Sequence, residues 1–271
     1  MTTYRKKRLT KPAKYLAAAF LAVALTISLA APAFALTVLY DHKTTETVTK
    51  GVTYTYDQQV TDAGLLDIHV LKIPLDDPYI TVGPATSTTD CGLKETVTKL
   101  LTENGAIAGT NGDFFGLAGD YSGSFGPEVK DGQLLSLSTA FNVDGPEYSA
   151  FFLDDKNNPF MQFMQSEVHF YNDGKENISV NAINKVSDFV FPVIVTPVAM
   201  SDTSSIDSRF PGLLKVVVSG DKITYVSQKG ETVKVPSDGY VLVIQEASAD
   251  WFGQFFKAGQ SARLEITTTG L

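Results

Sequence analysis

Polar and apolar positions alternate along the first part of the chain after residue 50. Val52–Tyr56 alternates strictly, and Leu65–Ile73 continues in residues that favour extended backbone. A period of two places every second side chain on the same face of a sheet, so both segments are predicted to be β-strands.

Turn residues separate further apolar runs towards the C-terminus. Ser219-Gly220-Asp221 lies between the apolar runs Leu213–Val218 and Ile223–Val226, which predicts a hairpin. Asp131-Gly132 also lies between apolar runs and predicts a second hairpin. Tyr240–Ile244 is continuously apolar, as a buried strand would be.

Two segments have the spacing of helices. The first has Thr89 or Asp90 as its N-cap, an apolar face of leucines and valine, and a stop at Asn104-Gly105. The second runs from Ser248 to Ala258, ends at Gly259, and directs an aromatic face towards the core.

Strands therefore outnumber helices, and the predicted fold class is α+β, a β-rich single domain with few helices. We expect a signal peptide over residues 1–35, a lead segment over 36–50 and the domain over 51–271. No closing element follows the strand predicted at Ala262–Thr267, so the C-terminal part of this domain is expected to be missing.

The signal-peptide prediction rests on three consecutive features. Six cations between Arg5 and Lys14 precede an uncharged apolar run, Tyr15–Leu29, and Ala33-Phe34-Ala35 supplies a cleavage site of small residues. The long basic region is typical of Gram-positive bacteria. Cleavage after Ala35 would leave no membrane span and predicts a secreted or cell-surface protein.

Charge restricts the partners of the mature chain. Losing the six cations ahead of Ala35 lowers the formal net charge by six, from −8 to −14. Nucleic acid and anionic membranes repel such a chain, so we exclude a nucleic-acid partner. The single cysteine, Cys91, excludes a disulfide within the chain.

The segment from Gly105 to Gly132 contains the richest candidate chemistry. Ala106–Gly109 is predicted to be a short buried strand that runs out into Thr110-Asn111-Gly112-Asp113-Phe114-Phe115. Asn111 can bind a hydroxyl or a phosphate oxygen, Asp113 can act as acid, base or nucleophile, and Gly112 allows a tight turn. The alternative is a purely structural turn, since Asn-Gly-Asp is common turn chemistry.

Other polar residues are weaker candidates. Glu128 could supply a second carboxyl group for glycosidic chemistry, whereas Asp131 is better explained by its hairpin turn. Asn184, Lys185 and Arg209 are polar candidates that, taken singly, more often lie on the surface. The three histidines are scattered, and phosphate-loop and dinucleotide motifs are lacking, so we expect neither a metal nor a cofactor.

Gly109-Thr-Asn-Gly-Asp-Phe-Phe115 resembles a motif of the phosphodiester glycosidase family, which includes the N-acetylglucosamine-1-phosphodiester uncovering enzyme and secreted bacterial relatives. The similarity continues in the same order along the mature chain, at Gly51–Tyr54, Leu66–Pro78, Gly126–Gly132, Asn181–Lys185 and Pro236–Leu242.

This resemblance implies hydrolysis of a sugar from a phosphodiester at the anomeric carbon. It implies that Asp113 does electrostatic or acid–base work, that Asn111 orients the sugar or the phosphate, and that Gly112, Phe114 and Phe115 shape the loop. The expected partner is a glycan or a sugar-phosphate, as in cell walls or capsules.

The chain departs from the family in one respect. A glycine-rich segment and a stretch similar to Arg-Thr-Ala-Ile-Gly, which supplies a basic group in bacterial members, do not occur before Leu271. An anionic substrate requires a fixed cation. The second hypothesis is therefore a non-catalytic cell-surface carbohydrate-binding or structural module with the same fold.

Overall fold

The computed structural model of the protein describes residues 36–87, 92–117, 119–123, 126–138, 148–173, 175–185 and 191–270. The expected signal peptide, Cys91 and both proposed N-caps of the first helix lie outside these residues. The chain divides into two compact units, one ending at Ile73 and the other beginning at Pro74. We refer to them as the N-terminal unit and the C-terminal unit.

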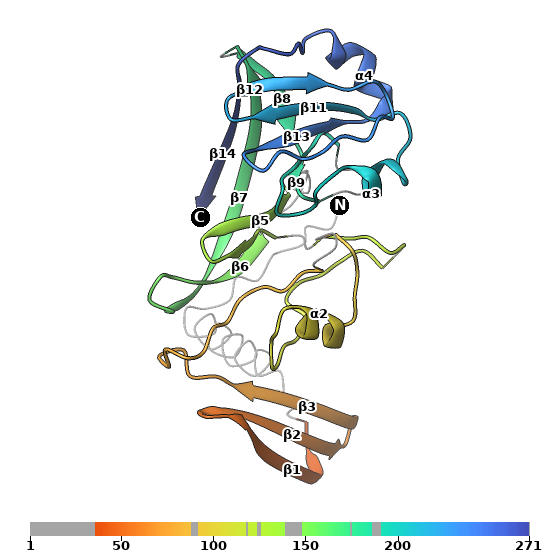
Figure 1. Cartoon of the computed structure of the whole chain (residues 1–271). Coiled ribbons are helices and arrows are strands. Elements are labelled where there is room, and N and C mark those ends of the chain that lie inside the picture. Colours follow the sequence, from red (N-terminus) through yellow and green to blue (C-terminus); the bar gives the residue numbers. More distant parts are fainter. Residues whose placement is uncertain are drawn as a thin grey trace, which may run out of the picture. The chain divides into compact units, whose positions relative to one another are not determined.

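The N-terminal unit is a three-stranded antiparallel sheet in the order β1-β2-β3 (Figure 1). Its strands are β1 (Val38–Thr49), β2 (Val52–Thr61) and β3 (Gly64–Lys72). The two strands predicted from alternation are thus confirmed as β2 and β3. Residues 36–50, expected as a lead segment, contain β1, which pairs with β2 along its length.

A seven-stranded sheet forms the centre of the C-terminal unit, and Figure 1 shows β11, β12 and β13 side by side within it. Its strands, in spatial order, are β12 (Lys222–Val226), β11 (Leu214–Ser219), β13 (Gly239–Ile244), β10 (Val193–Val195), β9 (Ala182–Ile183), β5 (Gln133–Ser138) and β4 (Glu128–Lys130).

A second sheet of the C-terminal unit is organised by one long strand, β7 (Pro159–Asn172). Its neighbours are β14 (Ala262–Gly270), β6 (Tyr148–Leu153) and β8 (Lys175–Val180). All three pair with β7 in antiparallel fashion. The strand predicted at Ala262–Thr267 is therefore confirmed as β14.

Both faces of the seven-stranded sheet are covered, which explains its uninterrupted apolar runs. On one face Val216, Val218 and Leu242 belong to a core cluster that also contains Phe170 of β7 and Phe256. The alternate residues of the same strands face a second cluster around Ile206. Tyr240–Ile244, predicted as a buried strand, accordingly lies in β13 with residues 241–244 fully buried.

The predicted hairpins are confirmed at both sites. Asp131 and Gly132 have φ angles of 51° and 74°, the pair of positive values that a type I′ turn requires, and they join β4 to β5. Gly220, with a φ of 58°, lies in the turn between β11 and β12.

The helices are shorter than predicted. Helix α2 (Val97–Glu103) has Thr96 as its N-cap, and not Thr89 or Asp90. The Thr96 side chain accepts a hydrogen bond from the Lys99 amide. Leu93, expected within the helix, instead forms a β-bridge with Tyr121. The backbone hydrogen bonds of this bridge are incompatible with a helical turn at the same residue.

The second predicted helix is also displaced, and a short additional helix occurs. Helix α4 (Glu246–Gly253) ends five residues before the predicted Ala258, and α3 (Ser204–Asp207) is a single turn. Phe256 is buried as expected, whereas Trp251 is exposed. The expected aromatic face is therefore only partly directed to the core, because the chain leaves the helix between these residues.

The β-rich α+β prediction is confirmed: 46% of the residues that the structure describes are in strands and 9% are in helices. None of the helices in the described part of the chain is long and apolar enough to cross a membrane.

Candidate functional site

The predicted site lies in an irregular loop of the C-terminal unit and not at the end of a buried strand. The strand expected at Ala106–Gly109 is wrong: these residues are not extended into a sheet, and Ile107 is 68% exposed. Gly109 lies against α2, because a Cβ atom there would be 2.7 Å from Cδ2 of Leu101. A larger residue at this position would therefore require the Leu101 side chain to move.

Asp113 connects two parts of this loop through its carboxylate. Oδ1 accepts a hydrogen bond from the Phe114 amide at 2.7 Å, and Oδ2 accepts one from the Gly126 amide at 2.9 Å. The second bond spans thirteen residues of the chain. Asp113 is therefore held in a defined position although the surrounding loop is exposed.

Lys185 lies beside the same peptide segment. Its Nζ donates to the Gly126 carbonyl oxygen at 2.6 Å, and the residue is only 5% exposed. Its aliphatic stem covers Gly123, where a Cβ atom would be 2.8 Å from Cγ of Lys185. The structure thus places a buried cation next to the residue that anchors Asp113.

Asn184 explains why Lys185 is buried here. Its backbone has a φ of 57°, a left-handed conformation that asparagine tolerates better than most residues. The side chain donates to the Leu135 carbonyl at 2.6 Å and to Thr196 Oγ1 at 2.8 Å, and it accepts from the Thr196 amide at 2.8 Å. These bonds join β5 to the segment after β10 and position the next residue, Lys185.

Two further cations contact the loop. The Arg209 guanidinium lies 3.5 Å from the centre of the Tyr121 ring, a distance typical of cation–π contact. Lys94 Nζ donates to the carbonyl oxygens of Gly116 and Leu117, both at 3.1 Å. We call the described residues between Gly109 and Gly126, with Lys94, Lys185 and Arg209, the cationic loop.

The other predicted site residues lie around Asp113 without such anchors. Asn111 is exposed, and its side chain has no hydrogen-bond partner within the described part of the chain. Gly112 does not have a positive φ, and a Cβ atom there would contact nothing within 4 Å, so the backbone conformation itself does not require glycine. Phe114 is 81% exposed and Phe115 is less so.

Glu128, the proposed second carboxyl group, is engaged elsewhere. Its Oε2 accepts a hydrogen bond from Ser136 Oγ at 2.6 Å, across the β4–β5 pair. This bond fixes Glu128 to the hairpin, and no hydrogen bond joins it to Asp113 within the described residues.

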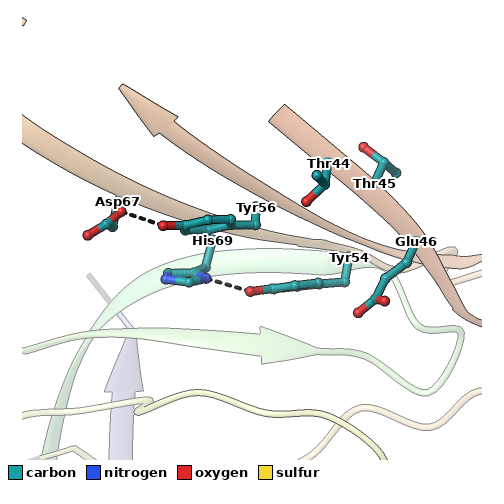
Figure 2. A pocket seen from close by; sticks show the side chains of 7 residues that line it. All are labelled: Thr44, Thr45, Glu46, Tyr54, Tyr56, Asp67 and His69. Carbon is teal, nitrogen blue, oxygen red and sulfur yellow. Dashed lines mark hydrogen bonds between the residues drawn. The ribbon is translucent and has the colours of Figure 1, made fainter. Parts of the chain in front are cut away.

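A separate hollow of about 650 Å³ lies on one face of the N-terminal sheet, shown in Figure 2. The strand register sets out this face in two rows, Thr44–Tyr56–His69 and Glu46–Tyr54–Leu71. Alternate residues of each strand therefore bring two tyrosines and a histidine together. We call this surface the tyrosine face.

Hydrogen bonds hold the rings of the tyrosine face in place. Tyr54 Oη and His69 Nδ1 are 2.6 Å apart, and Tyr56 Oη donates to Asp67 Oδ1 at 2.7 Å. The bond from Tyr56, together with one from Gln58, lowers the pKa of Asp67 below its ordinary value. The same bond to Asp67 raises the pKa of Tyr56.

Sequence reasoning did not identify the tyrosine face as a site. The alternation that predicted β2 already places Tyr54 and Tyr56 on the same side of the strand. His69 and Asp67 share the i, i+2 spacing on β3. The missing information was the register that sets His69 opposite Tyr56.

Metal ligands do not gather in the described residues: no group of three His, Cys, Asp or Glu side chains there could hold an ion.

Comparison with known proteins identifies solved structures with a similar fold, but it does not indicate an activity. No family model matches the chain, and no curated protein matches it. A crystal structure of a hypothetical protein from Synechocystis superposes with a TM-score of 0.58 at 16% identity, over 84% of this chain and 41% of that one. This chain thus spans about two fifths of the length of that protein.

A second solved structure is similar to the same extent. It is named "Putative exported protein" from Burkholderia pseudomallei K96243, and it superposes with a TM-score of 0.58 at 12% identity, over 88% of this chain and 69% of that chain. At such identities the likeness establishes a shared fold alone.

Proposed function

We propose that the protein is a phosphodiester glycosidase, a hydrolase that releases a sugar from a sugar-1-phosphodiester, and that the cationic loop is its active site. The observation that carries the proposal is the convergence of Asp113 and Lys185 on Gly126. The carboxylate can stabilise the sugar of such a substrate, and the cation can bind its phosphate.

The sugar half requires negative charge. Breaking the bond between the anomeric carbon and the bridging oxygen develops positive charge on the sugar ring, which a carboxylate stabilises. Two backbone amides hold the Asp113 carboxylate in a defined position, as such a role requires. Water supplies the oxygen that binds the anomeric carbon, and the bridging oxygen leaves with the phosphomonoester.

The phosphate half requires positive charge. The departing phosphate is stable as an anion and needs little help from an acid, but its charge must be balanced. Lys185 and Arg209 supply two cations beside the loop. In this proposal they take the place of the basic group that bacterial family members supply from a motif that does not occur before Leu271.

One observation favours the second candidate, a non-catalytic carbohydrate-binding or structural module. Both Asp113 oxygens already accept backbone hydrogen bonds. A carboxylate used in this way also serves as a loop anchor without any chemistry. Catalytic assays on Asp113 variants separate the two functions.

We also propose that the protein is exported from the cell. The tripartite pattern of residues 1–35 is that of a signal peptide, and the name of the Burkholderia neighbour describes export of that protein. We propose secretion or display at the cell surface, in a Gram-positive bacterium, with a glycan or sugar-phosphate as substrate.

The test is hydrolysis of the methyl phosphodiester of N-acetylglucosamine 1-phosphate by the mature chain. Asp113→Asn should lower turnover about a hundred-fold, as loss of a charge-stabilising group does. Asp120→Asn is the matched control, because Asp120 belongs to the same loop and is exposed. Equal rates for the wild type and Asp113→Asn would refute the proposed role of Asp113. Absence of hydrolysis by the wild type would favour the non-catalytic function.

A further inference from the structure

The tyrosine face presents a flat aromatic surface. The Tyr54 and His69 rings are inclined by only 17°, with centroids 6.0 Å apart, and their edges are joined by the 2.6 Å hydrogen bond. A bond between ring-edge atoms keeps two nearly parallel rings side by side. Figure 2 shows this arrangement, with the Tyr56 ring stacked on the His69 ring. The centroids of these two rings are 5.0 Å apart.

Hydrogen-bond acceptors lie at the two ends of this surface. Figure 2 shows Asp67 beyond Tyr56 and Glu46 beyond Tyr54. The Glu46 carboxylate has no hydrogen-bond or ion-pair partner among the residues that the structure describes. Asp67 is already bound to Tyr56 and Gln58, at 2.7 and 3.1 Å, which fixes its carboxylate in place.

We propose that the tyrosine face is a carbohydrate-binding site, on which a pyranose ring of a neutral glycan stacks over Tyr54 and His69. The negative charge on an aromatic face attracts the weakly positive C–H groups of a sugar ring. The carboxylates of Glu46 and Asp67 accept hydrogen bonds from its hydroxyl groups. The hollow, about 650 Å³, is within the ordinary size range of small-ligand sites.

The arrangement disfavours other ligands. Two carboxylates repel anions, so neither a phosphate nor an acidic peptide fits. An organic cation is best enclosed by rings standing at angles around it, whereas these rings are almost parallel, with angles of 17° and 26° to His69. A glycan therefore fits best, and its binding does not depend on the activity of the cationic loop.

The test is calorimetric titration of the mature chain with two neutral tetrasaccharides, cellotetraose and the β-1,4-linked tetramer of N-acetylglucosamine. At least one should bind. Tyr54→Ala should weaken binding about ten-fold, and Glu46→Gln, an exposed change that removes no internal bond, should weaken it several-fold. Thr53→Ala is the control, since Thr53 pairs with Thr47 and Lys72 and none of these three residues lines the hollow.

Three outcomes overturn the proposal. They are no heat of binding with either tetramer, equal affinity of Glu46→Gln and the wild type, and binding of tetramethylammonium in place of both glycans. Neither tetramer contains a phosphodiester, so Asp113→Asn should bind them as the wild type does. A negative result for glycan binding at the tyrosine face would therefore not contradict the proposed hydrolase activity. A negative result for hydrolysis would likewise not contradict glycan binding at the tyrosine face.

Discussion

Asp113 and Lys185, 72 residues apart in the sequence, bind opposite sides of one residue, Gly126. The Asp113 carboxylate accepts a hydrogen bond from the Gly126 amide, and the Lys185 ammonium group donates one to the Gly126 carbonyl oxygen. Because one backbone unit connects the carboxylate to the cation, a shift of either group is transmitted to the other. This connection is the physical basis of the proposed active site.

Lys185→Gln should raise the KM for the phosphodiester about ten-fold while changing kcat less, because glutamine can still donate to Gly126 but carries no charge. Steady-state kinetics on the methyl phosphodiester measures this effect. An uncharged aryl glycoside of the same sugar is the control substrate. If the KM for both substrates rises equally, Lys185 supports the loop and does not bind phosphate.

Gly239→Ala should destabilise the C-terminal unit by about 3 kcal/mol, because the added Cβ would meet the backbone of β11. It would lie 1.9 Å from the Val218 carbonyl oxygen. Gly83→Ala, where a Cβ contacts nothing within 4 Å, is the matched control. Urea unfolding compares them, and equal midpoints would contradict the close approach of β13 to β11.

Tyr240→Phe should leave stability unchanged or increase it by about 1 kcal/mol at pH 7, because the buried Tyr240 hydroxyl has no partner among the described residues. Burial raises the pKa of Tyr240 from 10.0 to about 12. The folded state therefore retains the proton that the unfolded state releases.

The pH dependence follows from this difference. The contribution of the raised pKa to the free energy of unfolding is present in full below pH 10. It is lost as the pH rises from 10 towards 12. Unfolding free energies should therefore decline more steeply in this range for the wild type than for Tyr240→Phe. Parallel curves for the two proteins would show that Tyr240 ionises as easily folded as unfolded.

Asp207→Ala should destabilise the fold by about 3–5 kcal/mol, because it leaves the ammonium group of Lys215 buried without its counter-ion. Lys215 is completely buried in β11, and Asp207 and the Glu231 carbonyl oxygen accept its hydrogen bonds. The double variant Lys215→Met/Asp207→Ala should recover most of the loss. Thermal unfolding that ranks the double variant below the single one would contradict this account.

Local patterns predicted much of the fold. The apolar run of β13 was recognised because both faces of its sheet are buried, and the Asp131-Gly132 hairpin because two consecutive positive φ angles favour those residues. Helix ends were predicted less well. The bridge from Leu93 to Tyr121, which excludes a helical turn, is a contact between distant residues.

The candidate site was only partly accessible to sequence reasoning. Asp113 was singled out by its motif, whereas Lys185 was one polar residue among several. Its burial depends on the left-handed conformation of Asn184 and on hydrogen bonds to Leu135 and Thr196. The tyrosine face likewise depends on strand register, which alternation alone does not specify.

The site of bond cleavage tests the central proposal most directly. Hydrolysis of the methyl phosphodiester in ¹⁸O-labelled water, followed by ³¹P nuclear magnetic resonance and mass spectrometry, identifies which bond is broken. Cleavage at the anomeric carbon predicts labelled N-acetylglucosamine and unlabelled methyl phosphate. Label in the phosphate, or no hydrolysis at all, would contradict the assignment of the cationic loop as a glycosidase site.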